Sequence, residues 1–137
     1  MVYLLLLCAV MKLFLLILLG FVGVTSVSCG AMMMLEPTGS LLWLDLHWLD
    51  HTRFQNYAVP GLLLALTGGV HLIAWSYLKT ARKNSLWWAL AAGVLIVGYE
   101  VVQMIMLQMT YWLQYLYIIF GFFIVLMSLQ LKHKELI

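Results

Sequence analysis

The chain of 137 residues is 66% hydrophobic and only 9% charged, with a formal net charge of +2 and a mean hydropathy of +1.06. Soluble domains are about half apolar and about a quarter charged, so a water-soluble domain of this size could not bury so much apolar surface. The composition therefore predicts an integral membrane protein. Because a spanning helix needs about 20 residues, residues 1–137 are expected to form one all-α domain, an antiparallel bundle of four spans with short loops.

The two cysteines, Cys8 and Cys29, stand on the same predicted helix. At a rise of about 1.5 Å per residue they lie about 30 Å apart, which is too far for a disulfide. The sequence also has no Cys-x-x-Cys pair. These features argue against a membrane thiol oxidoreductase.

The first apolar block is interrupted by Lys12. Residues 13–34 have the length of one span, and Met1–Val10 are expected to be an apolar extension in or along the inner interface. An alternative is a secretory signal, with Ser26-Val27-Ser28 as the small-residue run before Cys29. We favour a retained helix, because cleavage would leave three spans with incomplete packing.

An external loop is predicted at residues 35–57. Pro37 and Gly39 end the first helix, since proline disfavours its continuation and glycine suits a turn. Trp43 and Trp48 are typical anchors at a membrane interface. The loop also alternates polar and apolar residues, so helical and extended structures compete, and we expect a short helix lying in the interface.

The remaining spans are predicted at 58–78, 86–109 and 113–131, with turns at 79–84 and 110–112. Pro60 suits the first turn of a helix, where its missing N–H would have no partner. The Gly68-Gly69 pair predicts a surface that another helix approaches closely.

Basic residues determine the expected orientation through the positive-inside rule. One side of the predicted bundle receives Lys12, Lys79, Arg82, Lys83, Lys132 and Lys134. The other side receives Arg53 with Glu36, Asp45 and Asp50. We therefore expect a multi-pass protein of the bacterial cytoplasmic (inner) membrane, with both termini cytoplasmic.

A first candidate site lies inside the predicted membrane core and consists of Glu100, Gln103, His71, Thr67 and Tyr117. A carboxyl group at that depth costs about 2.5–3.5 kcal/mol on insertion scales. Counting from the turns places Gln103 opposite Tyr117, and Thr67 at a better height for Glu100 than His71, although a direct or water-bridged His71–Glu100 contact stays open. Two interpretations remain: a carboxylate that exchanges protons, or a neutral, hydrogen-bonded clasp that sets the register of the bundle.

A second candidate site lies in the external loop, where Asp45, His47, Asp50 and His51 are close in sequence. Two histidines four residues apart share one face of a helix, as in zinc sites. The sequence has neither H-E-x-x-H nor a third ligand at a clear spacing. We expect no cofactor, with a divalent metal at this loop as the minor alternative. Motifs for nucleophilic catalysis or nucleotide binding are absent.

Several short motifs resemble one group of proteins: Pro37-Thr38-Gly39, Phe54-x-x-Tyr57-x-x-Pro60-Gly61, Glu100-x-x-Gln103 and Trp112-Leu113-Gln114-x-x-Tyr117. Over about residues 12–131 the chain resembles small bacterial membrane proteins that are similar in outline to DoxX-like four-helix proteins. The resemblance implies a four-helix protein of the cytoplasmic membrane and no established reaction. Asp50-His51-Thr52 and His71 depart from the pattern, so the resemblance assigns no catalytic residue.

Three hypotheses follow. The leading one is a non-enzymatic membrane protein, either an accessory subunit or a bundle that binds a small ligand or lipid. Its partners would be the bilayer and other membrane subunits or further copies of itself, with no nucleic acid. The alternative is a proton-coupled small-molecule transporter that acts as an oligomer through Glu100. A third and weaker hypothesis is a metal-dependent membrane enzyme that uses His47 and His51.

Overall fold

The computed structural model describes residues 1–136, and this part of the chain consists of helices and connecting turns without a strand. Its elements are α1 (Val2–Leu35), η1 (Ser40–Leu42), η2 (Leu46–Leu49), α2 (Ala58–Lys79), α3 (Ser85–Leu107) and α4 (Trp112–Leu136). Here η denotes a short 3₁₀-helix. By length and composition, all four α-helices are long and apolar enough to cross a membrane. The prediction of an all-helical chain with four such helices is confirmed.

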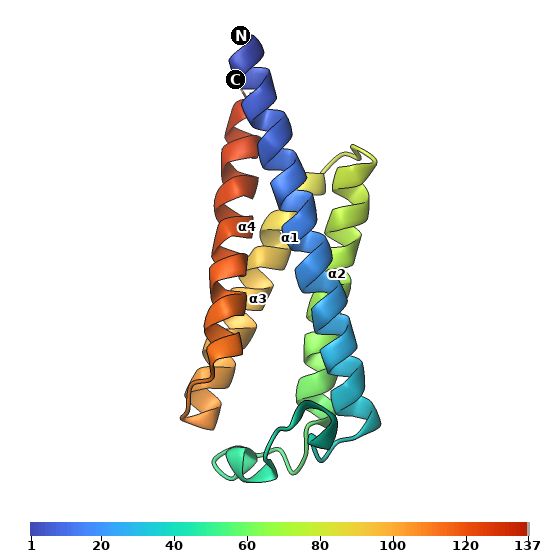
Figure 1. Cartoon of the computed structure of the whole chain (residues 1–137), viewed down its shortest axis with the longest axis vertical. Helices are drawn as coiled ribbons and strands as arrows, with labels where there is room; N and C mark the ends of the chain where they lie inside the picture. Colours follow the sequence, from blue (N-terminus) through green and yellow to red (C-terminus); the bar gives the residue numbers. More distant parts are fainter. Residues whose placement is uncertain (137) are drawn as a thin grey trace.

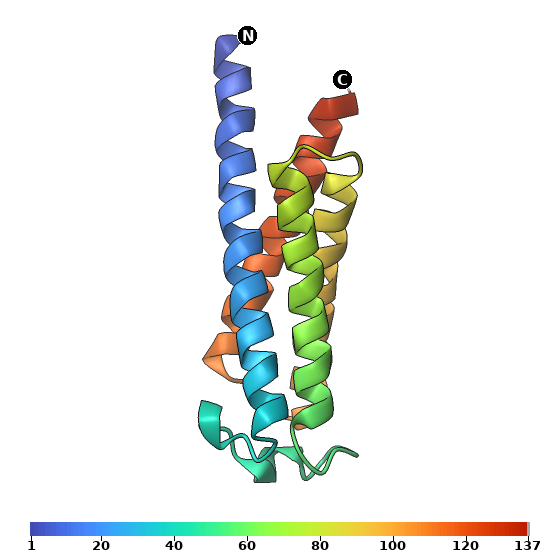
Figure 2. The ribbon, with the colours of Figure 1, turned by 90° about the vertical axis from the view of Figure 1, so that its right-hand side faces the viewer.

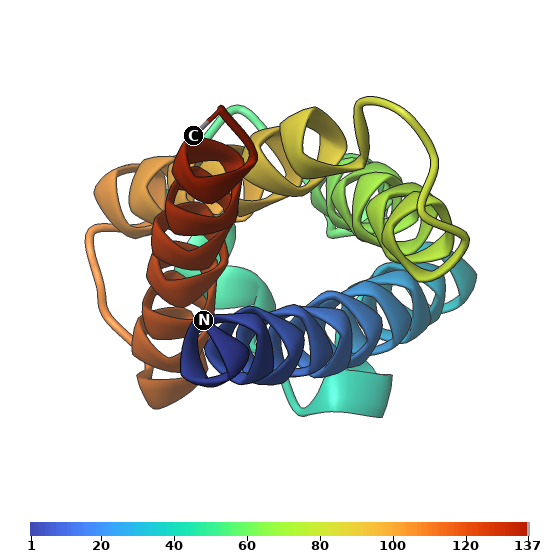
Figure 3. The same ribbon diagram turned by 90° about the horizontal axis from the view of Figure 1, so that it is seen from above.

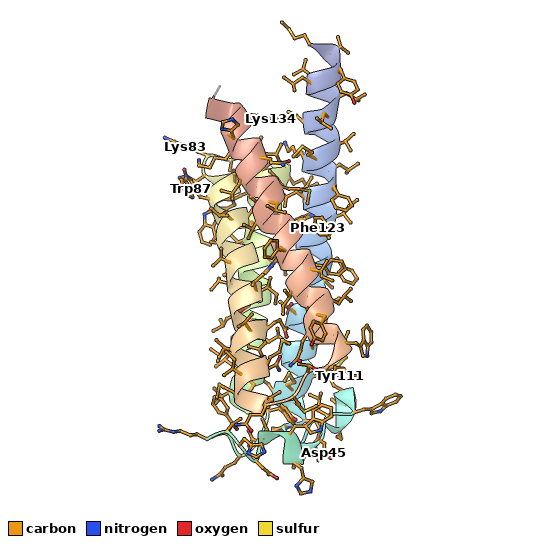
Figure 4. All side chains as sticks on the ribbon, turned by 90° about the vertical axis from the view of Figure 1, so that its left-hand side faces the viewer. Asp45, Lys83, Trp87, Tyr111, Phe123 and Lys134 are labelled. Carbon is orange, nitrogen blue, oxygen red and sulfur yellow. The ribbon has the colours of Figure 1, made fainter. Side chains whose placement is uncertain are left out.

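The four helices form a ring in the order α1, α2, α3, α4 when the molecule is seen from above (Figure 3). Successive helices run in opposite directions, so both termini lie at the same end as the α2–α3 turn (Figure 1). We call this the basic end, because Lys83 and Lys134 lie there, and the opposite end the loop end, because Asp45 and the rest of the 36–57 segment lie there (Figure 4). The α1–α2 pair and the α3–α4 pair diverge towards the loop end (Figure 1).

Glycines allow the closest contacts within each helix pair. A Cβ on Gly30 of α1 would lie 2.5 Å from the carbonyl oxygen of Gly61 on α2, and a Cβ on Gly68 would lie 2.9 Å from that of Gly23. In the other pair, a Cβ on Gly93 would lie 3.0 Å from the carbonyl oxygen of Gly121. Small residues that bring backbones together are typical of helix packing in membranes.

The Gly68-Gly69 pair predicted a close helix contact, and only Gly68 makes one. Gly68 packs against α1, whereas a Cβ on Gly69 would have no heavy atom within 4 Å.

The first helix differs from the expected span of residues 13–34, because α1 begins at Val2 and continues through Lys12 without interruption. The residues before Lys12 contain neither proline nor glycine, and leucine favours helix. A helix of 34 residues is about 51 Å long, well beyond a hydrocarbon core of about 30 Å. Its first turns extend beyond the α2–α3 turn (Figure 2).

The expected interfacial helix is replaced by η1 and η2, joined by irregular backbone. Gly39 and Trp43, which flank η1, both have left-handed backbone conformations, with φ of 81° and 57°. The side chain of Asp45 accepts a hydrogen bond of 2.9 Å from the backbone N–H of His47 and so caps η2. The left-handed conformation of Trp43 ends η1 after three residues, whereas Asp45 caps the beginning of η2.

The third helix ends at Leu107, two residues before the expected boundary, because Gln108 adopts a left-handed conformation with φ of 53°. Both cysteines are free thiols, as their predicted separation requires.

Candidate functional site

A groove of about 440 Å³ lies between α2 and α3 at the loop end, and we call it the lateral groove. Its lining residues are Leu49, Thr52, Phe54, Tyr57, Pro60, Leu63, Leu66, Thr67, Leu95, Gly98, Tyr99, Val102, Gln103, Met106 and Leu107. It opens on the outer surface of the bundle, where Leu66 is 60% exposed. A Cβ on Gly98 would have no heavy atom within 4 Å, so α3 meets no neighbouring helix at this position.

The polar groups that line the lateral groove are mostly bonded to the protein itself. The hydroxyl of Tyr99 crosses from α3 and donates to the carbonyl oxygen of Pro60 on α2 at 3.0 Å. The hydroxyl of Thr67 donates to the carbonyl oxygen of Leu63 at 2.9 Å. The surface offered to a ligand is therefore mainly hydrocarbon, with Gln103 as a polar exception.

A smaller cavity of about 140 Å³, the chamber, lies behind this groove in the middle of the helix ring. Every helix and the 36–57 segment contribute to its lining, which consists of Cys29, Met33, Leu42, Leu44, Trp48, Tyr57, Leu64, Tyr99, Glu100, Gln103, Leu107, Met109, Tyr111, Leu113, Gln114 and Tyr117. Tyr57, Tyr99, Gln103 and Leu107 line both cavities. The chamber and the lateral groove thus share one wall.

Glu100 contributes a carboxyl group to the chamber from the middle of α3, and its side chain is 3% exposed. Among the described residues the structure gives its carboxyl group no hydrogen-bond partner. Burying an unpaired polar group costs free energy. An occupant of the chamber that donates a hydrogen bond to this carboxyl would offset that cost.

Gln103 and Gln114 form the polar wall of the chamber beside Glu100. The side-chain nitrogen of Gln114 donates to the side-chain oxygen of Gln103 at 3.3 Å. Gln114 also accepts a bond of 2.8 Å from the backbone N–H of Tyr111, the residue before α4. A glutamine three residues into a helix commonly caps it in this way. Gln114 therefore joins α3 to the start of α4.

Tyr117 does not pair with Gln103, contrary to the register expected from counting along the helices. Its hydroxyl donates instead to Oγ1 of Thr25 on α1 at 2.9 Å. Counting from a turn assumed that α4 faces α3 at this height. The ring arrangement places α4 against α1 as well, and Tyr117 bonds to that neighbour.

His71 is fully buried and packs against α1, close to Gly23. Its Nδ1 lies 2.8 Å from the carbonyl oxygen of Thr67 on its own helix, and its Nε2 is unpaired among the described residues. The hydroxyl of Ser26 is likewise buried without a partner there. The structure brings Glu100 and Gln103 together in the chamber with Tyr117, but it places neither His71 nor Thr67 in the lining.

The 36–57 segment closes the chamber at the loop end. The hydroxyl of Tyr57 donates to the carbonyl oxygen of Asp45 at 2.6 Å, and the backbone N–H of Tyr57 donates to that of Pro37 at 2.9 Å. The rings of Trp48 and Tyr111 lie 6.0 Å apart and join the segment to the α3–α4 turn. Burial and, second, the charge of Asp45 raise the pKa of Tyr57 to about 12, so its hydroxyl stays neutral near pH 7.

The predicted metal ligands in this segment are only partly brought together. Nδ1 of His47 lies 3.4 Å from Oδ2 of Asp50, and both side chains are largely exposed. Asp45 is used as the cap of η2. The segment forms no α-helix, so His47 and His51 lose the shared face that suggested zinc binding. Within residues 1–136 no group of three or more His, Cys, Asp or Glu side chains is arranged to hold a metal ion.

Several chamber residues were not singled out as site residues from the sequence. The position of Gln114 just after a turn is a capping signal, and Tyr57 stands three residues before Pro60 at the start of a span. These positions relative to the turn and to Pro60 can be read from the sequence. In contrast, the Thr25–Tyr117 bond joins residues 92 positions apart, and no local pattern indicates it.

Comparison of the chain with protein-family models, with curated proteins and with solved structures finds no significant match.

Proposed function

We propose that this is a non-enzymatic, multi-pass protein of the bacterial inner membrane whose bundle binds a lipid-like ligand in the lateral groove. The resemblance to DoxX-like proteins supports the membrane and the bundle. The groove supports the ligand: its volume of about 440 Å³ falls in the range of ligand sites, about 300–1,000 Å³.

An acyl chain of a bilayer lipid is the occupant that fits this groove best. The groove opens between two helices that are apolar enough to span a membrane, so its mouth would face lipid. Its polar hydroxyl groups are already bonded to the protein. A hydrocarbon ligand needs no hydrogen bond from them, whereas a polar solute would leave most of its own polar groups unpaired in this groove.

Native mass spectrometry of gently extracted protein tests this proposal. Gly98→Leu is expected to fill the groove and remove tightly held lipid. Gly69→Leu is the matched control, because both glycines are helical and face open space, but Gly69 does not line the groove. Equal lipid retention by the two variants after collisional activation would refute the proposal. The same spectra would reveal any partner subunit or further copy of the chain.

Proton-coupled transport through Glu100 is the second candidate, and the unpaired carboxyl group in the chamber supports it. Proteoliposomes with an imposed pH gradient and ethidium as the probe cation provide a test. The transporter hypothesis requires that Glu100→Gln abolish exchange and that Glu100→Asp retain some. The binding hypothesis requires no exchange in the wild type above that of empty vesicles.

A further inference from the structure

A second pocket lies at the basic end, far from the chamber, and we call it the basic pocket. Its volume is about 360 Å³. Its lining residues are Cys8, Ala9, Lys12, Leu78, Ala81, Arg82, Ser85, Leu86, Leu131 and Lys134. The ends of all four helices therefore contribute to it, and Lys83 and Lys134 lie at this end of the molecule (Figure 4).

The cations at this end fall into two groups. Lys79, Arg82 and Lys132 each lie over an aromatic ring, at 4.8 Å from the Trp75 centroid, 5.2 Å from Tyr77 and 4.2 Å from Trp87, respectively. Lys12 and Lys134 are half-buried at the pocket, and Arg82 lines the pocket as well but is exposed. The nearest polarisable partner that the structure gives Lys134 is the sulfur of Met11 at 3.9 Å.

The backbone adds to the positive potential of the basic pocket. Ser85 and Leu86 are the first two residues of α3, a helix of 23 residues whose N-cap, Asn84, makes no side-chain capping bond. The N–H of Ser85 donates to the carbonyl oxygen of Arg82 at 3.3 Å, but the N–H groups that follow it in this uncapped first turn and the helix dipole both favour an anion. Carboxylates do not compete for these cations from the described side chains, because Glu36, Asp45, Asp50 and Glu100 belong to the loop end and the chamber.

We propose that the basic pocket binds the phosphate of an anionic phospholipid, with Lys12 and Lys134 as its principal cationic contacts. The apolar walls indicate a lipid rather than a soluble phosphate. Leu78, Leu86 and Leu131 line the pocket beside the cations, and they offer hydrocarbon to the glycerol and upper acyl groups. Basic pockets between spanning helices are a recognised arrangement for anionic lipid headgroups.

The length of α1 fits this proposal. Cys8 and Ala9, in the part of α1 that extends beyond the expected span, form one wall of the pocket.

The binding of an anionic phospholipid at this pocket rests on the proposed membrane location but not on a ligand in the lateral groove. The two sites lie at opposite ends of the bundle.

The test measures lipid selectivity by native mass spectrometry, with phosphatidylglycerol and phosphatidylcholine added in equal amounts. The wild type is expected to retain phosphatidylglycerol preferentially. At about 1 kcal/mol per basic residue near a lipid surface, the Lys12→Gln/Lys134→Gln variant should lose about thirtyfold of that preference. The Lys79→Gln/Lys132→Gln variant is the control, because it removes the same charge from the same end but not from the pocket.

Each outcome decides between site-specific binding and its alternatives. Equal losses in the two double variants would show attraction to the general positive charge of this end and would overturn the proposal. Displacement of phosphatidylglycerol by inorganic phosphate would identify a soluble anion as the ligand and would also overturn it. Retention of groove lipid by a protein without headgroup preference would refute this inference while leaving the proposed function intact.

Discussion

The two halves of the bundle differ in how their interiors are filled. In the half towards the basic end, apolar side chains such as Leu19, Ala74, Ala92 and Ile124 are completely buried. In the half towards the loop end, the helix pairs diverge (Figure 1) and leave the chamber and the lateral groove. Side chains therefore fill the middle of the bundle between the basic pocket at one end and the chamber and lateral groove at the other.

The polar groups show the same contrast. Ser128, in the basic half, is buried, but its hydroxyl donates to the carbonyl oxygen of Ile124 at 2.6 Å. Glu100 lines the hollow half with no partner among the described residues. Ser128 is thus satisfied by its own helix, although Nε2 of His71, also buried, has no partner among the described residues. The hollow half presents its most polar group to a cavity, which is the arrangement of a site rather than of a core.

The largest change in stability is expected from Gly93→Leu. Gly98→Leu, on the same helix, is its comparison variant. A side chain at residue 93 meets the backbone of Gly121, which cannot move without separating α3 from α4. We expect a loss of about 3 kcal/mol or more and a marked fall in Tm in detergent. Gly98→Leu should keep the wild-type Tm within a few degrees. Comparable melting of the two variants would contradict the difference between the halves.

Glu100→Leu is expected to stabilise the protein. This change is smaller than that of Gly93→Leu and opposite in sign. The Glu100 side chain is 3% exposed and borders the chamber, and withdrawing an unpaired polar group from water costs about 1–3 kcal/mol. Its replacement by leucine should therefore raise the free energy of unfolding by about 1 kcal/mol. Thermal unfolding in one detergent would measure the change. Ser128→Ala serves as the control, because it removes a satisfied hydroxyl and should not stabilise the protein. Destabilisation by Glu100→Leu would show that the carboxyl group has a partner after all.

The smallest change in stability is expected in the 36–57 segment, which closes the chamber. Tyr57→Phe removes the bond to Asp45 and should cost about 1 kcal/mol. Burial and Asp45 raise the pKa of the Tyr57 hydroxyl to about 12, against about 10 in an unfolded chain. Its contribution is therefore complete below pH 10 and is lost between pH 10 and 12.

Unfolding measured from pH 8 to 12 in wild type and Tyr57→Phe tests this pH dependence. The stability difference between the two proteins should be constant up to about pH 10 and then shrink. A difference that grew with pH would mean that the ionised tyrosine is stabilised, and it would contradict the burial of Tyr57.

The sequence by itself determined the number and approximate position of the helices. Twenty-residue apolar runs are a local property, and the energetic cost of exposing backbone groups to lipid makes helix the available structure for them. It also indicated that Glu100, in the middle of such a run, needs protein around it. Local signals were sufficient as well for the end of α1 near Pro37 and for the beginning of α2 near Pro60.

Only the tertiary structure decided which polar residues meet. Tyr117 bonds to Thr25, and Gln103 bonds to Gln114, because the helices close into a ring and diverge at one end. The ring and the divergence of the helices both depend on where glycines let two backbones approach. Gly68 lies against α1, whereas its sequence neighbour Gly69 has no heavy atom within 4 Å of the position of a Cβ. The difference arises from the face that each glycine presents to another helix, which is a property of the assembled bundle.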